Sequence, residues 1–202
     1  MVELLVASRN AKKLAELRRI LDAAQVDGIA LVGLDEVAPF DEAPETAETF
    51  EGNALAKAQD ACAATGMACV ADDSGLEVDA LHGMPGVLSA RWSGVHGDDS
   101  ANTALLLAQM VDVPDQRRGA GFVSASALVV PGGVEVVVRG QWRGRIARTP
   151  SGMNGFGYDP VFIPDGCARS SAELTPQEKD AHSHRARALE QLLPALRRLA
   201  DV

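Results

Sequence analysis

Two neighbouring carboxylates in the middle of the chain are of the residue type that phosphate chemistry needs. Asp72 and Asp73 follow one apolar run and precede Ser-Gly and a second apolar run. Because adjacent aspartates repel each other and are costly to bury, the pattern predicts a turn between strands at 68–72 and 76–79. Carboxylate oxygens at a strand end suit Mg2+, which usually brings substrate phosphates with it. The alternative is a polar turn with no catalytic role.

Two lysines stand at the start of a predicted helix, where the helix dipole disfavours cations. A predicted strand at 3–7 is followed by Ser8-Arg9-Asn10 and then by Lys12 and Lys13. Exposed N–H groups at a helix start, together with lysines, predict a binding site for a phosphate chain. An asparagine cap with solvated lysines is the alternative. The helix has one apolar face, formed by Leu14, Leu17, Ile20 and Leu21.

A second dense stretch, 152–160, reads Gly-Met-Asn-Gly-Phe-Gly-Tyr-Asp-Pro. Its glycines let the backbone approach a ligand, and Phe156 and Tyr158 offer flat faces on which a nucleobase can stack. The alternative is a glycine-rich turn with core aromatics. Farther along, His184 and Arg185 stand at a predicted helix start. Both can donate hydrogen bonds to base oxygens.

The surrounding segments predict the elements that must position these groups. The acidic, proline-bearing stretch 35–48 predicts a loop, and a helix begins at Thr49 and runs to Ala64. We interpret Lys57 on that helix as an ordinary surface lysine rather than as a second phosphate cation. Other segments predict a shaped loop at 83–94, a helix from Asp98 to Met110, a hairpin over 119–148 and a capping box at 175–178.

Size and composition limit the classes of function. The 202 residues fit one domain, or one domain with two lobes. A net charge of −9 argues against a nucleic-acid scaffold. The three cysteines form no CxxC pair, which favours reduced thiols. No signal peptide and no run of membrane-spanning length is visible, so we expect a soluble, cytoplasmic protein.

Six motifs, taken together and in order, resemble the inosine triphosphate pyrophosphatase family, whose members are also described as dITP/XTP pyrophosphatases. The resemblance covers nearly the whole chain. The motifs are residues 8–13, 49–58, 71–76 and 85–91, then 155–160, and finally Glu178-Lys179 with Ser183-His184-Arg185.

The resemblance implies an α/β fold, in which a long twisted mixed sheet is flanked by helices and two lobes surround a central active-site cleft. It implies one nucleoside-triphosphate pyrophosphatase domain over residues 1–202, and a homodimer. It also implies a reaction in which Mg2+ assists hydrolysis of deaminated purine nucleoside triphosphates (ITP, dITP, XTP) between the α and β phosphates. The products are a monophosphate and pyrophosphate, so the enzyme would remove non-standard nucleotides.

Residue roles follow from the resemblance by motif. Spacing alone cannot choose between Asp72 and Asp73 as the base, and the resemblance selects Asp73 as proton acceptor and metal ligand. Glu45 is expected to be the second metal ligand, with Glu48 as its rival. The expected substrate contacts are Ser8, Arg9, Asn10, Ala11, Lys12, Lys13, Ser74, Phe156, Gly157, Tyr158, Asp159, Lys179, His184 and Arg185.

Three other functions stay open at this point. One is a related nucleotide pyrophosphatase with a different base preference. A nucleotide-binding sensor without turnover is the second. The third is a structural or interaction protein, which leaves the paired aspartates and the clustered glycines without a role.

Overall fold

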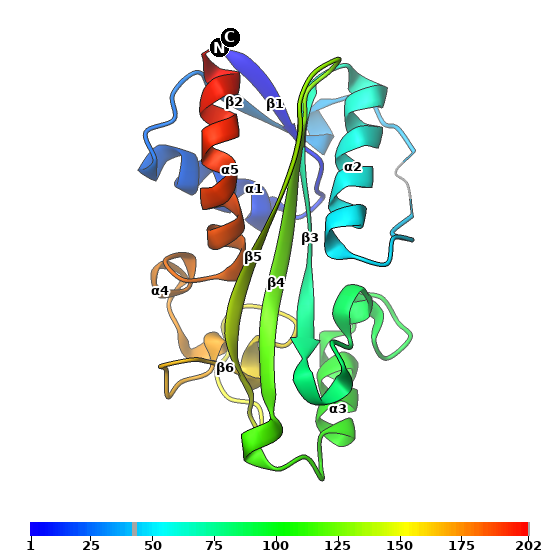
Figure 1. Cartoon of the computed structure of the whole chain (residues 1–202), viewed down its shortest axis with the longest axis vertical. Coiled ribbons are helices and arrows are strands. Elements are labelled where there is room, and N and C mark those ends of the chain that lie inside the picture. Colours follow the sequence, from blue (N-terminus) through cyan, green and yellow to red (C-terminus); the bar gives the residue numbers. More distant parts are fainter. Residues whose placement is uncertain (42–43, 202) are drawn as a thin grey trace. The chain divides into compact units, whose positions relative to one another are not determined.

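The computed structural model describes residues 1–41 and 44–201, apart from the side chains of Ala11, Lys12 and Asp180. Six strands form one mixed sheet in the order β2-β1-β3-β4-β5-β6 (Figure 1). β1 is parallel to β2 and β3, and β5 is antiparallel to β6. The strands are β1 Val2–Val6, β2 Ile29–Gly33, β3 Ala68–Val78, β4 Gly119–Val129, β5 Glu135–Ile146 and β6 Phe162–Pro164. The α/β mixed-sheet prediction is confirmed.

Helices lie between several of the strands along the chain. The α-helices are α1 Ala11–Ala23, α2 Phe50–Thr65, α3 Asp99–Gln109, α4 Pro176–Asp180 and α5 His184–Ala200. Short 3-10 helices lie at Leu34–Glu36, Asp79–Leu81, Gly86–Arg91, Asp115–Arg117, Asp159–Val161 and Ser171–Glu173. Among the described residues, no helix is long and apolar enough to span a membrane.

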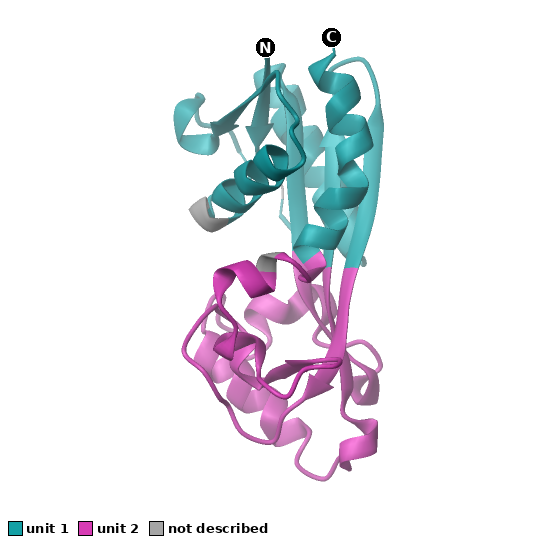
Figure 2. Cartoon of the chain, turned by 90° about the vertical axis from the view of Figure 1, so that its left-hand side faces the viewer, with its two compact units in different colours: residues 1–73, 124–140, 185–202 teal, residues 74–123, 141–184 magenta. Residues whose placement is uncertain are grey.

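The chain divides into two compact units. Unit 1 comprises residues 1–73, 124–140 and 185–202, and unit 2 comprises 74–123 and 141–184 (Figure 2). β3, β4 and β5 contribute residues to both. Each unit has its own hydrophobic core.

The core of unit 1 is aliphatic. In it, α1 and α5 pack on one side of the strands, and α2 lies on the other side (Figure 1). Its buried members include Leu4, Val6, Leu17, Leu21, Val70, Leu128, Leu189, Leu192 and Leu196. The core of unit 2 is richer in aromatic rings and contains Phe122, Trp142, Tyr158 and Phe162.

The predicted starts of three helices are confirmed by their N-terminal caps. Thr49 caps α2, and its side chain accepts from the Gly52 N–H. Asp98 caps α3 by accepting from the Ala101 N–H at 2.9 Å. The predicted capping box before α4 is present, with Thr175 as its N-cap.

One other prediction of an element is wrong, and two are incomplete. The predicted turn at the aspartates does not exist, because β3 runs unbroken from Ala68 to Val78 through both of them. The loop at 83–94 contains the 3-10 helix Gly86–Arg91, and the loop at 35–48 begins within another, Leu34–Glu36. The sequence analysis also missed β2, a short run of small and aliphatic residues.

Candidate active site

The order of the parallel strands explains why Lys13 meets the aspartates. From β1 the chain passes through α1 to β2 on one side, and α2 then leads to β3 on the other side of β1. Ligands of open α/β sheets bind at the carboxyl ends of strands, where the direction of winding reverses. Here the segment after β1 carries Lys13, and its Nζ lies 2.8 Å from Asp72 Oδ1.

Asp72 belongs to a group of charges on one face of β3. Arg185 Nε lies 3.5 Å from Asp72 Oδ2, and Arg185 Nη1 donates to Glu16 Oε2 at 2.9 Å. Burial tends to raise the pKa of Asp72, but the positive charges of Lys13 and Arg185 outweigh it and lower that pKa to about 2. Asp72 is therefore ionised throughout the neutral range and is a weak proton acceptor.

Asp73 points to the opposite face, because side chains alternate along a strand. It is 8% exposed. Its Oδ2 accepts from Asn53 Nδ2 at 2.9 Å, and its Oδ1 lies 3.6 Å from Lys57 Nζ. Burial raises the pKa of Asp73 above its ordinary value, and the positive charge of Lys57 only partly opposes this. A carboxylate with a raised pKa is the better general base of the two.

Lys57 is not the ordinary surface lysine that its sequence context suggested. Its Nζ donates to Glu45 Oε1 at 2.6 Å and to the Asp72 carbonyl at 3.1 Å. Burial tends to lower the pKa of Lys57. The negative charges of Asp73 and Glu45 raise it by more, so the pKa lies above its ordinary value. Lys57 is therefore a cation of the site.

The side chains around Lys57 include oxygen donors of the kind that bind Mg2+. Glu45 and Asp73 both face the Lys57 ammonium, so two carboxylates already converge on one positive charge. Within the described residues, no group of three His, Cys, Asp or Glu side chains could hold a metal. Mg2+ is commonly held by one or two carboxylates plus substrate phosphates and water, so the oxygen donors fit it. Glu48, the rival ligand, is exposed.

Asn53 is a site residue that the sequence analysis did not assign. Besides donating to Asp73, its Oδ1 accepts from the Ala47 N–H at 2.9 Å. It therefore ties the loop that carries Glu45 to the carboxylate in β3. Its position on α2, one turn before Lys57, was the signal that could have identified it.

The segment after β1 borders a cavity of about 480 Å³ in unit 1. Ser8 and Arg9 line it together with the end of β2, and Ser8 Oγ accepts from the Asn10 N–H at 3.2 Å. The predicted contacts Ala11 and Lys12 have side chains that lie outside the described part of the chain.

Unit 2 contains the predicted base-binding stretch, residues 152–160. Phe156 is 47% exposed, and Lys179 Nζ lies 5.5 Å from its ring centroid. Tyr158 is 4% exposed, and its hydroxyl donates to the Ser89 carbonyl at 2.9 Å. The expectation that both aromatic faces are available is therefore wrong: Phe156 offers a face, and Tyr158 belongs to the core.

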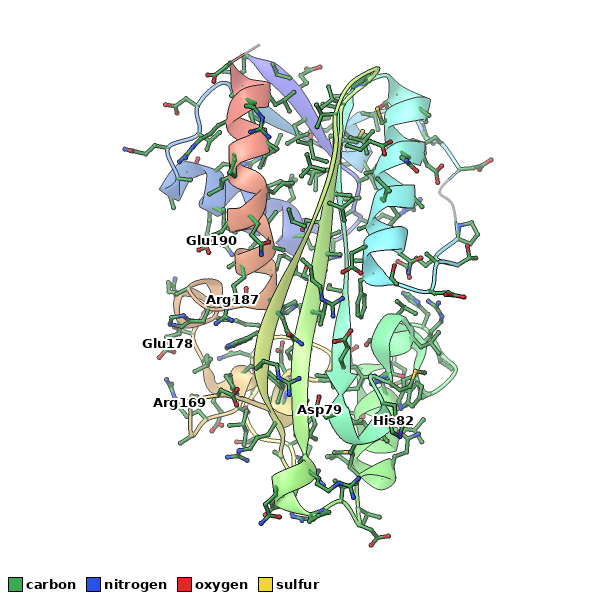
Figure 3. All side chains as sticks on the ribbon, viewed as in Figure 1. Asp79, His82, Arg169, Glu178, Arg187 and Glu190 are labelled. Atoms are coloured by element: carbon green, nitrogen blue, oxygen red, sulfur yellow. The ribbon has the colours of Figure 1, made fainter. Side chains whose placement is uncertain are left out.

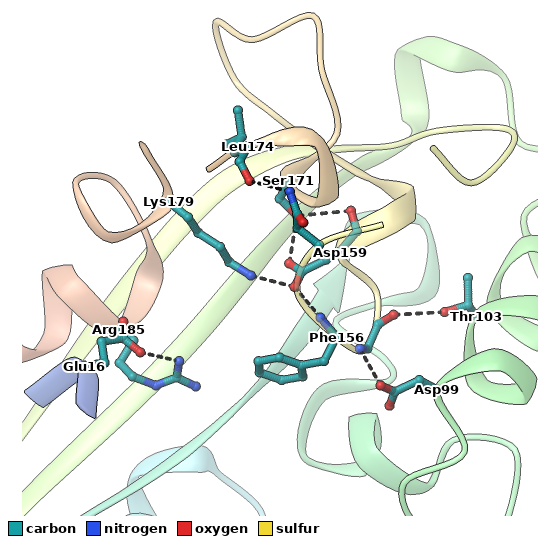
Figure 4. Close-up of polar contacts among 11 residues, drawn as sticks. Glu16, Asp99, Thr103, Phe156, Asp159, Ser171, Leu174, Lys179 and Arg185 are labelled. Carbon is teal, nitrogen blue, oxygen red and sulfur yellow. Dashed lines mark hydrogen bonds and ion pairs between the residues drawn. The ribbon is translucent and has the colours of Figure 1, made fainter. Parts of the chain in front are cut away.

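Asp159 shapes this loop from within. It is 2% exposed, and it accepts from the Phe156 N–H at 2.9 Å and from Ser171 Oγ at 2.8 Å. Its Oδ2 also pairs with Lys179 Nζ at 2.5 Å (Figure 4). These bonds place Phe156 and Lys179 beside each other.

The short helix α4 fixes the backbone of Lys179. Glu178 Oε2 accepts from the Thr175 N–H at 2.8 Å, and Glu178 Oε1 accepts from Arg169 Nη2 at 2.7 Å (Figure 3). The hydrogen bond from Arg169 is the main reason that the pKa of Glu178 is lowered to about 2.

Three predicted contacts lie at positions where the chain passes from one unit to the other. Ser74 follows Asp73 in β3. His184 is buried and stacks on Phe122 with ring centroids 5.0 Å apart. Arg185 joins the charges of unit 1. The structure thus gathers Lys13, Glu45, Asp73 and Arg185 in unit 1, and Phe156 to Asp159 with Lys179 in unit 2.

The chain is similar to known proteins along nearly its whole length. The Ham1 family model matches residues 4–195. A Nocardia farcinica protein named dITP/XTP pyrophosphatase is 72% identical, with 100% of this chain and 98% of that protein covered. A Mycolicibacterium paratuberculosis protein of the same name is 73% identical, with 99% and 98% covered.

Solved structures give the same result. The crystal structure of a nucleoside-triphosphatase, dITP/XTP pyrophosphatase, from Mycobacterium abscessus has a TM-score of 0.82 at 66% identity, with 96% of this chain and 100% of that chain covered. A HAM1 protein from Coxiella burnetii has a TM-score of 0.89 at 40% identity, with 97% and 98% covered. The chain belongs to the Ham1 family.

Proposed function

We propose that the protein hydrolyses deaminated purine nucleoside triphosphates, such as dITP, ITP and XTP, to the monophosphate and pyrophosphate. The observation that carries the proposal is Asp73, a buried carboxylate with a raised pKa set among lysines. The names of the similar proteins supply the substrate class. Residues 1–202 would act as one catalytic domain.

Charge explains why such a site needs a divalent cation. A triphosphate carries about four negative charges near neutral pH. The ion-paired cluster of unit 1 has one more carboxylate than cations when all are ionised, so it would repel that substrate by itself. Its members are Glu16, Glu45, Asp72, Asp73, Lys13, Lys57 and Arg185. Mg2+ held by Asp73 and Glu45 would supply the missing positive charge and polarise the α-phosphate.

The residues of the chain then have separate roles. Asp73 accepts a proton from a water molecule whose oxygen attacks the α-phosphorus. The bond from that phosphorus to the bridging oxygen breaks, and pyrophosphate leaves. Lys13, with the start of α1, neutralises phosphate charge. Asp72 keeps Lys13 and Arg185 in place.

Recognition of the base is a matter of hydrogen bonds. Hypoxanthine and xanthine present a 6-oxo acceptor, where adenine presents a 6-amino donor. We propose that the base stacks on Phe156 and that donors of unit 2, Lys179 or His184, contact it. Adenine would then leave a donor facing a donor, a mismatch that can discriminate by about 10⁴-fold.

A substrate panel tests the proposal. With Mg2+ present, we expect dITP, ITP and XTP to be hydrolysed with a kcat/KM about 10⁴-fold above that of ATP, with pyrophosphate as product. Equal rates with ATP would contradict base recognition. A preference for a pyrimidine triphosphate would support the alternative base preference, and binding without pyrophosphate release would support the sensor.

The second metal ligand can be tested with a matched pair of variants. Glu45→Gln should raise the Mg2+ concentration for half-maximal activity at least about 10-fold, because it removes a carboxylate that faces the same point as Asp73. Glu48→Gln, which alters an exposed carboxylate in the same loop, should leave it unchanged. The reverse result would identify Glu48 as the ligand.

Two further expectations of the resemblance remain proposals. We propose that the enzyme is a homodimer, which sedimentation analysis measures directly. We also propose that it acts in the cytoplasm, where the nucleotide pool lies.

A further inference from the structure

Two side chains near the start of α3 hydrogen-bond to the backbone of Gly157, the residue after Phe156 in the loop 152–160. We call this pair of hydrogen bonds the α3 anchor. The Gly157 N–H donates to Asp99 Oδ2 at 2.7 Å, and Thr103 Oγ1 donates to the Gly157 carbonyl at 3.4 Å (Figure 4). Asp99 and Thr103 are four residues apart on one helix, so they share a face. Both polar groups of the Gly157 backbone are therefore held by side chains of α3.

The α3 anchor therefore lies immediately after Phe156, whose ring is partly exposed. The Phe156 N–H is held by Asp159, and the next residue is held by Asp99 and Thr103. Gly157 has a φ of +60°, in the left-handed region that favours glycine, and it has no side chain to pack. Since Phe156 is 47% exposed as a residue, packing alone does not fix its ring. Its direction therefore depends on the anchored backbone on either side, as well as on the Lys179 ammonium 5.5 Å from its centroid.

α3 is itself firmly placed within unit 2. Asn102 is 1% exposed and accepts from the Ser93 N–H at 2.7 Å, and Leu106 is fully buried in the core of unit 2. Asp98 supplies the helix cap, which leaves the Asp99 carboxylate available for the loop. The helix is thus a fixed support, and Asp99 and Thr103 are its contacts to the loop.

We propose that Asp99 and Thr103 are positioning residues for nucleobase binding: they hold the Gly157 backbone, and thereby the Phe156 ring, in the orientation that accepts the base. We assign them no role at the phosphates or at the attacking water. The effect on nucleobase binding rests on the proposed function, whereas the α3 anchor itself does not.

Amide hydrogen exchange tests the α3 anchor in the absence of substrate. In Asp99→Ala, the peptide that contains Gly157 should exchange about 5- to 10-fold faster, because its amide loses its acceptor. Asp99→Asn keeps an oxygen acceptor and should exchange like wild type. Asp112→Ala, which removes another exposed aspartate of unit 2, should also leave the loop unchanged. Unaltered exchange in Asp99→Ala would overturn the proposal.

Kinetics with dITP and Mg2+ test the consequence for the base. Asp99→Ala should raise KM about 5- to 10-fold with kcat within about twofold of wild type, and Asp99→Asn should restore KM. Thr103→Val should shift KM in the same direction by less, because its contact is longer. Faster exchange with an unchanged KM would overturn the role in base binding. If wild type does not hydrolyse dITP, the proposed function fails. The exchange result still shows whether the α3 anchor holds the loop.

Discussion

Asp73→Asn should lower kcat by about 10²-fold or more, the usual scale for losing a general base. The amide has nearly the same shape as the carboxylate, so its oxygen can still accept from Asn53 Nδ2. It cannot accept a proton from water, and it carries no charge for a metal. Single-turnover rates with dITP at saturating Mg2+ measure the chemical step.

The pH dependence separates this role from a structural one. Because Asp73 must be ionised to act as a base, wild-type activity should fall as the pH drops through the pKa of Asp73, which burial raises in the metal-free protein and a bound cation would lower. The residual activity of Asp73→Asn should lose this acidic limb. Glu48→Gln, an exposed site, should keep both the rate and the profile. Near-normal turnover in Asp73→Asn, with its fold verified by circular dichroism, would remove Asp73 from the mechanism.

Asp72 and Asp73 show how far local sequence reasoning reaches. Their residue type predicts a role in phosphate chemistry, which remains a proposal, whereas the predicted turn is wrong. The cost of placing two aspartates in a strand is offset by Lys13, 59 positions before Asp72, and by Arg185, far along the chain. No window of neighbouring residues contains these partners. Alternation along β3 then gives the two carboxylates different partners and opposite pKa shifts.

Lys57 and Tyr158 show the same limit. Lys57 looks like a surface lysine on α2, and only the fold brings Glu45 and Asp73 to its ammonium. Phe156 and Tyr158 are equivalent in the sequence, but the Ser89 carbonyl, which binds the Tyr158 hydroxyl, comes from a distant segment. By contrast, caps at Thr49, Asp98 and Thr175 depend on neighbours, and they were predicted correctly.

Asp72→Asn should destabilise the fold by about 3–5 kcal/mol, the usual cost of removing one partner from a buried group of charges. The variant leaves Lys13 and Arg185 facing an uncharged amide, with Glu16 as the other partner of Arg185. Urea unfolding at pH 7 in the presence of EDTA measures the loss. Asp27→Asn, an exposed site in unit 1, is the matched control and should unfold like wild type.

The effect of Asp72 should also depend on pH in a defined direction. Its pKa is lowered from 3.8 to about 2 in the folded protein, so the ionised form stabilises the fold above pH 3.8. That contribution, about 2 kcal/mol, is lost as the pH falls from 3.8 towards 2, because Asp72 of the unfolded chain takes up a proton in this interval while Asp72 of the folded protein still resists it. The stability gap between wild type and Asp72→Asn should therefore narrow over this interval. A gap that stays constant between pH 7 and pH 2.5 would mean that Asp72 stabilises unit 1 by its shape rather than by its charge.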